Sequence, residues 1–313
     1  MNPALPSLLT DALTGLLEGT PRKELAAAAA RMSAGYRAGE SSKAIVTTLE
    51  ALAYAVARMP ATYAACAAMF ARVAEVMADF APTSLLDVGA GTGAASWAAL
   101  AQWPDIQTIT MLDHNPALRE LARKLADLLR HADILSGDLA VEKPKADLVV
   151  ASYVLAELPQ EKIAAAVLDL WRSADGALAL IEPGTPDGFA RIRAARAALI
   201  GEGASVAAPC THDNVCPMSG DDWCHFSQRL PRSRDHMLLK DATVPFEDER
   251  YSYVVVTRQK AAAGARILAP PLEAKSGLTF KLCDESGLRA EFVAARDKDA
   301  YRRVRKSGWG DRF

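Results

Sequence analysis

The chain has 313 residues, half of them hydrophobic, and a formal net charge of −2. This length supplies a core for two or three structural units, and the near-neutral charge excludes a protein that attracts polyanions over its whole surface. No apolar run approaches the roughly twenty residues of a membrane span, and the N-terminus lacks the basic start of a signal peptide. We therefore expect a soluble, cytoplasmic, bacterial-type monomer with no membrane partner.

Residues 1–80 have the pattern of a helical N-terminal region. Apolar residues recur at helical spacing, and Thr20 followed by Pro21 predicts a helix start, because Thr caps helices and Pro fits the first helical position. Pro60 is expected to divide the last two helices. The predicted helices cover 5–18, a stretch after Thr20, 41–59 and 61–80. We expect this region to cover one rim of a ligand site or to face a partner.

Between residues 81 and 257, short apolar runs alternate with helical patterns. Such alternation is typical of a parallel, doubly wound α/β sheet. The predicted strands are 84–88, 107–112, 134–137, 146–152, 177–181 and 251–257, and the predicted helices are 94–100, 116–130, 159–171 and 189–200. The sequence therefore predicts one α/β core over residues 81–257, with a cysteine-rich segment at 208–240.

The segment 84–94, SLLDVGAGTGA, joins the first predicted strand to the first core helix. Gly89, Gly91 and Gly93 let the backbone come close to a ligand because they carry no Cβ, and the free N–H groups of the following helix face the same place. Gly89, Gly91 and Ala94 also fit the pattern G-x-G-x-x-A of dinucleotide-binding loops. The loop predicts a small-molecule site, and its neighbours must identify the ligand.

Three carboxylates favour one ligand. Asp87 precedes the loop, Asp113 ends the second strand at the offset of a ribose-binding acid, and Asp138 follows the third strand. A carboxylate beside the loop would repel a pyrophosphate, but it suits S-adenosylmethionine, which offers an ammonium group, ribose hydroxyls and an adenine amine. The alternative is that these acids are helix caps and solvated strand ends. The predicted cofactor-binding residues are Asp87, Gly89, Ala90, Gly91, Gly93, Asp113 and Asp138.

Four cysteines form a second candidate site. Cys210, Cys216 and Cys224 fall within fifteen residues, and Cys283 ends a predicted hairpin strand. In a cytoplasmic chain such clustering indicates a metal rather than disulfides, although ordinary core thiols are the alternative. Four thiolates can hold zinc or a 4Fe–4S cluster, and the spacing C-x5-C-x7-C, wider than that of zinc-ribbon pairs, favours the cluster.

Two histidines and a fifth cysteine lie outside that set. His212 or His225 could replace a cysteine as a metal ligand, but a position beside the site or at the surface is the commoner role of such residues. Cys66 stands alone in an alanine-rich helix, so we expect a small buried apolar residue there.

Seven segments resemble one family in order along the chain. These are SLLDVGAGTGA, ASYVLAELP, LIEPGTPDGF, APCTHDNVCPM, DDWCHFSQRLPRS, PFEDERYSYVVVTR and AYRRVRKSGWGD. The first is similar to the first motif of class I methyltransferases, and the set resembles the Rsm22 family of ribosomal small-subunit methyltransferase-like proteins, of which this would be a bacterial member. The likeness runs from about residue 85 to the C-terminus, and the cysteine block is its most specific part.

The resemblance implies a class I, Rossmann-like methyltransferase fold that uses S-adenosylmethionine and carries a four-cysteine iron–sulfur site. Carried over by position, the cluster ligands would be Cys210, Cys216, Cys224 and Cys283. The family acts on small ribosomal subunits. No catalytic residue can be predicted, because the N/D-P-P-Y segment that holds an amino nitrogen is missing. Glu157 and Glu182, near strand ends, could shape an acceptor pocket or could be helix caps.

The C-terminal segment 258–313 is predicted to be a basic extension with a β-hairpin. It has 13 Lys and Arg residues against 7 Asp and Glu, a net charge of +6. Such a segment suits a polyanionic partner, here small-subunit rRNA and its proteins, or is a solvated face. Trp309 could stack on an unpaired base. The two basic runs are Arg229, Arg232, Arg234 and Lys240, and Arg302, Arg303, Arg305 and Lys306.

These observations leave several functions open. The first is an S-adenosylmethionine-dependent methyltransferase of small-subunit rRNA with an iron–sulfur site. The second is a non-catalytic assembly factor that keeps the same fold and binds rRNA. A zinc-stapled methyltransferase of another substrate and a dinucleotide-dependent redox enzyme are weaker alternatives, and Asp87 argues against the latter.

Overall fold

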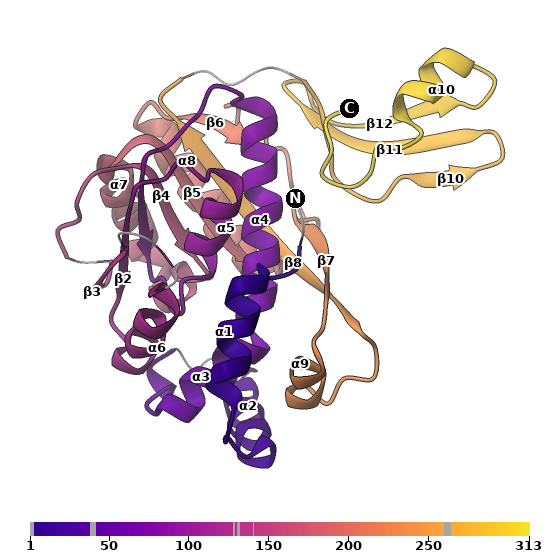
Figure 1. Cartoon of the computed structure of the whole chain (residues 1–313). Coiled ribbons are helices and arrows are strands. Elements are labelled where there is room, and N and C mark those ends of the chain that lie inside the picture. Colours follow the sequence, from indigo (N-terminus) through magenta and orange to yellow (C-terminus); the bar gives the residue numbers. More distant parts are fainter. Residues whose placement is uncertain (1–2, 38–41, 128, 130–131, 140, 260–263) are drawn as a thin grey trace.

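The computed structural model describes residues 3–37, 42–127, 129, 132–139, 141–259 and 264–313. Its N-terminal part is helical, and the long helix α4 lies along the α/β core (Figure 1). The elements of this part are α1 (Ser7–Leu17), α2 (Arg22–Arg37), the 3₁₀ turn η1 (Ser42–Ala44), α3 (Thr48–Ala57) and α4 (Met59–Val76). None of the helices in the described ranges is long and apolar enough to span a membrane.

The predicted single helix over 41–59 is wrong. The Thr47 side chain accepts a hydrogen bond from the Glu50 N–H at 3.2 Å, and the Glu50 carboxylate accepts one from the Thr47 N–H at 3.0 Å. This reciprocal capping box starts α3 after η1. Pro60 also differs from its prediction, because it lies in the first turn of α4, where the N–H that it lacks needs no partner.

An eight-stranded sheet forms the core of the molecule. Its strands follow the order β3-β2-β1-β4-β5-β8-β6, and β7 pairs with part of β8. The ends of β1 and β2 lie side by side, with Val88 opposite Leu112. The strands are β1 (Ser84–Val88), β2 (Thr108–Asp113), β3 (Ala132–Ser136), β4 (Ala146–Ser152), β5 (Ala174–Pro183), β6 (Ser205–Ala208), β7 (Phe226–Pro231) and β8 (Phe246–Thr257).

The predicted all-parallel sheet is wrong at one edge. Strands β1 to β5 are parallel, but β8 is antiparallel to β5, β6 and β7. The apolar run 251–257 does not indicate whether its strand runs parallel or antiparallel to its neighbours. That direction depends on the β7–β8 hairpin, whose connection contains helix α9 (Arg234–Leu239). In the strand order, the sixth strand, β8, is antiparallel to the first five, and the seventh, β6, is parallel to them. This is the strand arrangement of class I methyltransferases, so the predicted Rossmann-like fold class is confirmed.

Helices cover both faces of this sheet. One face packs on α4, α5 (Ala94–Gln102) and α6 (Pro116–Ala126), with Phe70, Trp97 and Leu121 in one hydrophobic cluster. The other face packs on α7 (Ile163–Ser173) and α8 (Pro186–Gly201), where Val167 and Leu199 join the second cluster. The short turns η2 (Leu155–Glu157) and η3 (Gln160–Lys162) lie between β4 and α7.

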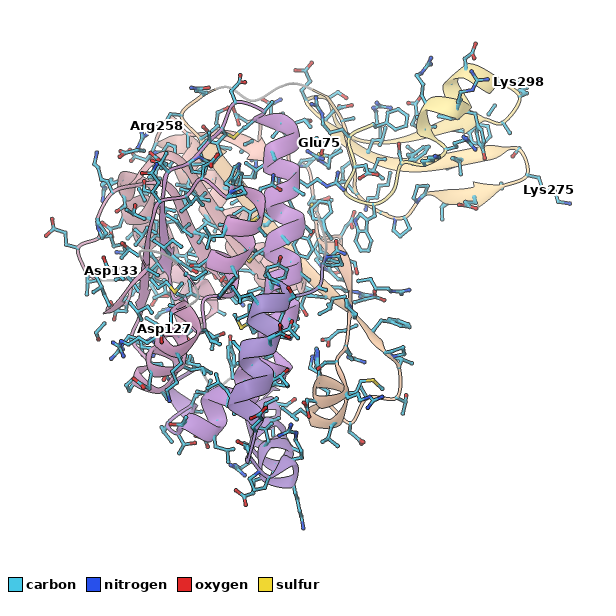
Figure 2. The ribbon with its side chains drawn as sticks, in the orientation of Figure 1. Glu75, Asp127, Asp133, Arg258, Lys275 and Lys298 are labelled. Carbon is cyan, nitrogen blue, oxygen red and sulfur yellow. The ribbon has the colours of Figure 1, made fainter. Side chains whose placement is uncertain are left out.

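A second, four-stranded sheet follows and projects from the core (Figure 1). Its separate hydrophobic cluster includes Phe280 and Leu282, against which Tyr301 of α10 packs. Lys275 and Lys298 lie on this projecting part and point away from the core (Figure 2). The elements are β9 (Arg266–Ile267), β10 (Leu272–Ala274), β11 (Gly277–Asp284), β12 (Gly287–Ala294) and α10 (Lys298–Val304), and β11 and β12 form an antiparallel hairpin.

Candidate functional site

The glycine loop is fastened to the end of β2. The N–H groups of Gly89 and Ala90 both donate to the Leu112 carbonyl, at 2.8 and 3.0 Å. One Asp113 carboxylate oxygen accepts from the Gly91 N–H at 2.7 Å, and the other accepts from the Asn115 N–H at 2.7 Å. Asp113 therefore orders the loop whose ligand it was predicted to bind, and burial raises its pKa.

The loop conformation needs its glycines. Gly89, Gly91 and Gly93 have φ values of +72°, +56° and +86°, which L-residues adopt at a cost. A Cβ on Gly89 would come within 2.6 Å of the Val154 side chain, whereas one on Gly91 would have only Tyr54 ring atoms near it, at 3.9 Å. Gly91 is thus the loop position with space above it.

Asp87 lies beneath the loop and is fully buried. One carboxylate oxygen accepts from the Ser96 N–H at 3.1 Å and from the Ser96 hydroxyl at 2.7 Å. The other oxygen, Oδ1, has no hydrogen-bond partner within the described ranges. Burial raises the pKa of Asp87 to about 7, although the bonds from Ser96 oppose this rise. A cationic group at Oδ1 would pair with this carboxylate and favour its ionised form.

Asp138 lies at the same edge of the sheet as these two acids, beyond the end of β3. The preceding Gly137 N–H donates to the Asp113 main-chain carbonyl at 3.2 Å. Asp138 is exposed, whereas Asp87 and Asp113 are buried. Its predicted contact with an adenine stays a prediction.

The N-terminal region reaches this edge through residues that the sequence did not single out. The Asn115 side chain donates to the Ser42 and Ile45 carbonyls, each at 2.8 Å, and the Ser42 hydroxyl donates to Glu157 at 2.6 Å. Tyr54 of α3 lies over Gly91. The helices before residue 80 therefore cover one side of the glycine loop.

A strained tyrosine follows β4. Tyr153 has a φ of +59°, which is rare for a non-glycine residue and clusters at functional positions. Its hydroxyl donates to Glu249 at 2.8 Å, and Glu249 pairs with Arg58 at 3.4 Å. Glu182, the other acid considered for an acceptor pocket, is held by the Leu155 N–H and by Arg191, both at 2.9 Å, and thus has a structural role.

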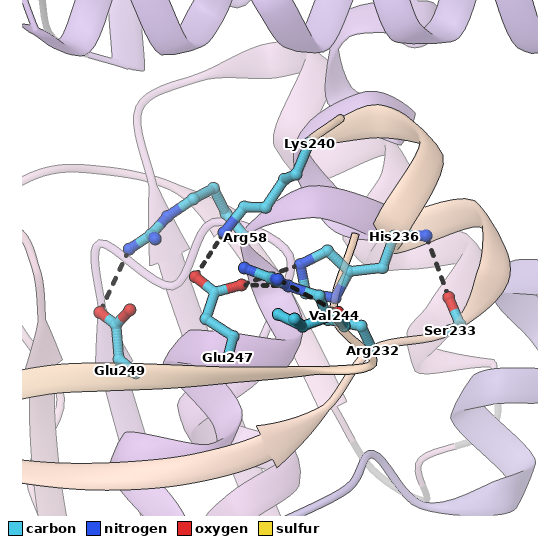
Figure 3. Close-up of polar contacts among 8 residues, drawn as sticks. All are labelled: Arg58, Arg232, Ser233, His236, Lys240, Val244, Glu247 and Glu249. Carbon is cyan, nitrogen blue, oxygen red and sulfur yellow. Dashed lines mark hydrogen bonds and ion pairs between the residues drawn. The ribbon is translucent and has the colours of Figure 1, made fainter. Parts of the chain in front are cut away.

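Beside this group, Glu247 collects three basic side chains (Figure 3). Arg232 and His236 approach one of its oxygens at 3.2 Å, and Lys240 approaches the other at 2.5 Å. Burial alone would raise the pKa of Glu247, but the bonds from His236 and Lys240 hold it well below 4.5. This network fixes α9 against β8.

Replacing Glu247 with glutamine should destabilise the protein by about 3 kcal/mol, because it leaves partly buried cations without their counter-charge. Because the folded pKa is lowered, the contribution of Glu247 is present above pH 4.5 and is lost progressively as the pH falls below it. Urea unfolding at pH 7 and pH 3 should therefore show a large difference between wild type and variant at pH 7 and a smaller one at pH 3. An equal difference at both pH values would contradict this assignment.

The four predicted cysteine ligands line one cavity. Cys210, Cys216 and Cys224 come from the 209–225 loop before β7, and Cys283 comes from β11. Burial and, to a smaller extent, the neighbouring cysteines raise the pKa of the Cys210, Cys224 and Cys283 thiols, that of Cys283 to about 12. Within the described residues, no group of three or more His, Cys, Asp or Glu side chains is already arranged to hold a metal ion. The cluster ligands stay a prediction.

Both histidines lie near this cavity. His212 is buried, and its Nε2 lies 3.5 Å from the Cys283 sulfur. His225 stacks on Trp223 with ring centroids 5.0 Å apart. Cys66 is distant in sequence from the other four cysteines and is fully buried in α4.

The 209–225 loop is held from both sides. Asp213 accepts from the Val206 N–H at 2.7 Å, and the Trp223 ring N–H donates to the Gly184 carbonyl at 3.0 Å. On the other side, Asn214 donates to the Glu285 carbonyl at 3.1 Å, and Lys281 pairs with Asp222 at 2.5 Å. The loop therefore joins the core to the C-terminal hairpin.

The two basic runs differ in their partners. Arg229 makes two 2.8 Å bonds to Asp248, and Arg232 and Lys240 share Glu247, so three of the four basic residues in the first run have an acidic partner. In the second run, Arg302, Arg303, Arg305 and Lys306 are exposed, and in the described part of the chain only Arg302 has an acidic partner, Asp299 at 3.5 Å. The Trp309 and His225 rings form a T-shaped contact with centroids 5.0 Å apart, and the predicted stacking of Trp309 on a base stays a prediction.

Comparison with known proteins agrees with this fold. The model of a family described as "Mitochondrial small ribosomal subunit Rsm22" matches residues 48–313. The human "Ribosome assembly protein METTL17, mitochondrial" is 29% identical over 285 residues, 83% of this chain and 61% of the relative. The "Rsm22-cox11 tandem protein 2, mitochondrial" of Schizosaccharomyces pombe is 28% identical over 88% of this chain and 44% of the relative. The chain thus spans about half of the length of these curated relatives.

Solved structures are more distant. Magnesium protoporphyrin IX methyltransferase from Synechocystis PCC 6803 with bound SAM has a TM-score of 0.41 and 19% identity, over 64% of this chain and 84% of that one. An O-methyltransferase family protein from Burkholderia thailandensis has a TM-score of 0.43 and 16% identity, over 68% and 60%. The strand order assigns the fold, and the family match covers the core, the cysteine loop and the C-terminal sheet. The chain belongs to the Rsm22 family.

Proposed function

We propose that this protein is an S-adenosylmethionine-dependent methyltransferase-like protein that acts on the small ribosomal subunit or its rRNA. The observation that supports it best is the glycine loop fixed between two buried carboxylates at the carboxyl ends of β1 and β2, in a chain of the Rsm22 family. Open α/β sheets bind their ligands at this edge. The human relative is named as a ribosome assembly protein, which supports the ribosomal partner.

The residues at this edge of the sheet fit S-adenosylmethionine. Asp87 Oδ1, which has no partner in the described ranges, can accept its ammonium group. Each Asp113 oxygen uses one lone pair on a main-chain N–H, of Gly91 or of Asn115, and can still accept ribose hydroxyls. The Gly91 N–H already donates to Asp113, but a Cβ at Gly91 would meet nothing closer than the Tyr54 ring at 3.9 Å, so the ligand has room beside this position. The cofactor would supply an activated methyl group on a sulfonium. Its adenine would extend toward Asp138.

The residues around β4 would orient the acceptor. Tyr153 directly follows β4, the strand next to the loop, and its hydroxyl donates to Glu249 of β8, which also pairs with the Arg58 guanidinium. The helices α3 and α4 cover the same side and would exclude water from it. Orientation and desolvation can lower the barrier of methyl transfer without a catalytic base.

A non-catalytic assembly factor is the second candidate. Two observations favour it: Tyr54 covers the loop at Gly91, and the name of the human relative refers to assembly rather than to methylation. Such a protein would keep the fold and the RNA-binding surface. The presence of a methyl group on rRNA that depends on this protein separates the two candidates.

We also propose that Cys210, Cys216, Cys224 and Cys283 hold a 4Fe–4S cluster, with zinc as the alternative. The fit rests on four thiols that line one cavity, with Met218 and Leu268 among its other walls. Soft thiolate ligands suit either centre. The cluster would have a structural role, because it would tie the 209–225 loop to β11.

The RNA surface can be tested with the Arg302→Ala, Arg303→Ala, Arg305→Ala triple variant. It should bind small-subunit rRNA more weakly, and the slope of log K against log salt should fall by about 2, because three phosphate contacts are lost. Arg229→Ala is the matched control, since Asp248 already neutralises that guanidinium. Filter binding at several salt concentrations measures both. Identical slopes for wild type and triple variant would rule out this surface.

A further inference from the structure

Arginines line the cysteine cavity together with the four thiols. Arg193 and Arg196 come from α8, and Arg266 comes from β9. Arg196 is 5% exposed and Arg266 is 1% exposed. A guanidinium stays charged in a protein interior, and buried arginines are rare unless an anion compensates them. Two such groups beside one cavity need an explanation.

The partners of these two arginines are carbonyl groups rather than full charges. Arg196 donates to the His212 carbonyl at 2.7 Å, and its Nε has no partner among the described residues. Arg266 donates to the Pro209 and Gly310 carbonyls, each at 2.9 Å, and its Nη2 likewise has no partner in the described ranges.

One carboxylate approaches Arg266. Glu75 lies 3.7 Å from its Nη1 and also pairs with Arg72 at 3.1 Å, while Arg72 has a closer partner of its own, Asp311 at 2.6 Å. Glu75 therefore compensates Arg266 only through a long contact. Arg193 differs from both buried arginines, because it is exposed and its guanidinium lies over the Phe189 ring, 5.5 Å from the centroid. The buried positive charge of the cavity therefore comes from Arg196, which has no ion-pair partner among the described residues, and from Arg266, whose one carboxylate lies 3.7 Å away.

A four-thiolate centre would supply the missing anion. Four thiolates around a doubly charged zinc ion or an oxidised 4Fe–4S core carry a net charge of −2. This charge is equal in magnitude and opposite in sign to that of the two guanidinium groups. We propose that Arg196 and Arg266 are the counter-ions of this centre. They help the protein to retain the centre, and they help to set its reduction potential. This inference rests on the proposed four-cysteine site.

The charge balance predicts a direction. One-electron reduction adds a third negative charge to the centre, and in a medium of low polarity a nearby guanidinium stabilises the reduced form more than the oxidised form. Removing one arginine should therefore shift the midpoint potential to a more negative value and weaken the retention of the centre. A lysine in the same place should restore much of both, since it keeps the charge.

Arg196→Met and Arg196→Lys test this best, because within the described ranges Arg196 makes a single main-chain hydrogen bond, whose loss should spare the fold. Arg258→Met is the control, since Arg258 also binds main-chain carbonyls, of Trp171 and Ala174, but does not line the cavity. Anaerobically purified proteins are assayed for iron and sulfide and titrated by EPR-monitored reduction. We expect a more negative midpoint and lost iron for Arg196→Met, with Arg196→Lys and the control close to wild type. Equal midpoints and iron contents in all four proteins would overturn the proposal.

Failure of the iron–sulfur assignment gives a different result. If the wild type holds one zinc and no sulfide, the 4Fe–4S proposal falls, and the arginines are tested by the rate of zinc loss to a chelator. Faster loss from Arg196→Met than from Arg196→Lys and Arg258→Met then supports the counter-ion role, and equal rates overturn it. A wild type without zinc, iron and sulfide would overturn both the four-cysteine site and the counter-ion proposal.

Discussion

Replacing Cys283 with serine should remove the metal centre and loosen the C-terminal sheet from the core. Cys283 is the proposed ligand on β11, while the other three lie on the 209–225 loop. The free energy of metal binding is also folding free energy, on the order of 10 kcal/mol for structural centres, so losing this ligand removes the strongest proposed link between loop and sheet. The wild type purified without oxygen should contain about four irons and four sulfides per chain, and the variant should contain almost none.

Metal and sulfide analysis, the visible absorption spectrum and limited proteolysis of the C-terminal sheet measure these effects. Cys66→Ala is the matched control, because Cys66 is buried in α4 and does not line the cavity. It should keep the full metal content. One zinc per wild-type chain without sulfide would replace the iron–sulfur assignment by a zinc-stapled protein. A full complement of iron and sulfide in the serine variant would contradict the role of Cys283.

The core of the fold could be predicted because its strands are short, apolar and separated by helices. The predicted strand 146–152 agrees with β4 to the residue, since a buried central strand is apolar throughout. β6 and β7 were not predicted. β6 has four residues, and β7 mixes buried and exposed positions and acquires its partner, β8, only from the tertiary fold. Strand direction at that edge depends on the same long-range pairing.

The candidate site likewise has a part that could be predicted from the sequence and a part that could not. Asp87 and Asp113 were predicted from their places at strand ends, and parallel strands bring such ends to one edge. The contacts of Ser42 and Tyr54 with this edge could not be predicted, because they join ordinary residues that are far apart in sequence. Asn115 before Pro116 is readable as a helix cap, but a cap signal does not reveal that the Asn115 amide also binds the Ser42 carbonyl.

Gly91→Arg should abolish S-adenosylmethionine binding while the protein stays folded. The backbone there has a φ of +56°, which costs an L-residue about 1 kcal/mol, and an added Cβ would meet nothing closer than 3.9 Å. The remainder of the arginine side chain would fill the space over the loop next to Tyr54, where the cofactor is proposed to lie. Equilibrium dialysis with labelled cofactor measures binding, and thermal unfolding checks that the variant is folded.

Gly203→Arg is the matched control, because Gly203 has a φ of +83° and nothing within 4 Å of its Cβ position. It introduces the same strain and charge beyond the end of α8 and should leave cofactor binding unchanged. The two variants, returned to cells that lack the gene, then separate the two proposed functions. A methyl group on small-subunit rRNA that returns with the wild type and Gly203→Arg but not with Gly91→Arg identifies an enzyme. If no methyl group depends on the gene, and Gly91→Arg restores subunit assembly as well as the wild type does, the glycine loop is dispensable and the protein works as an assembly factor.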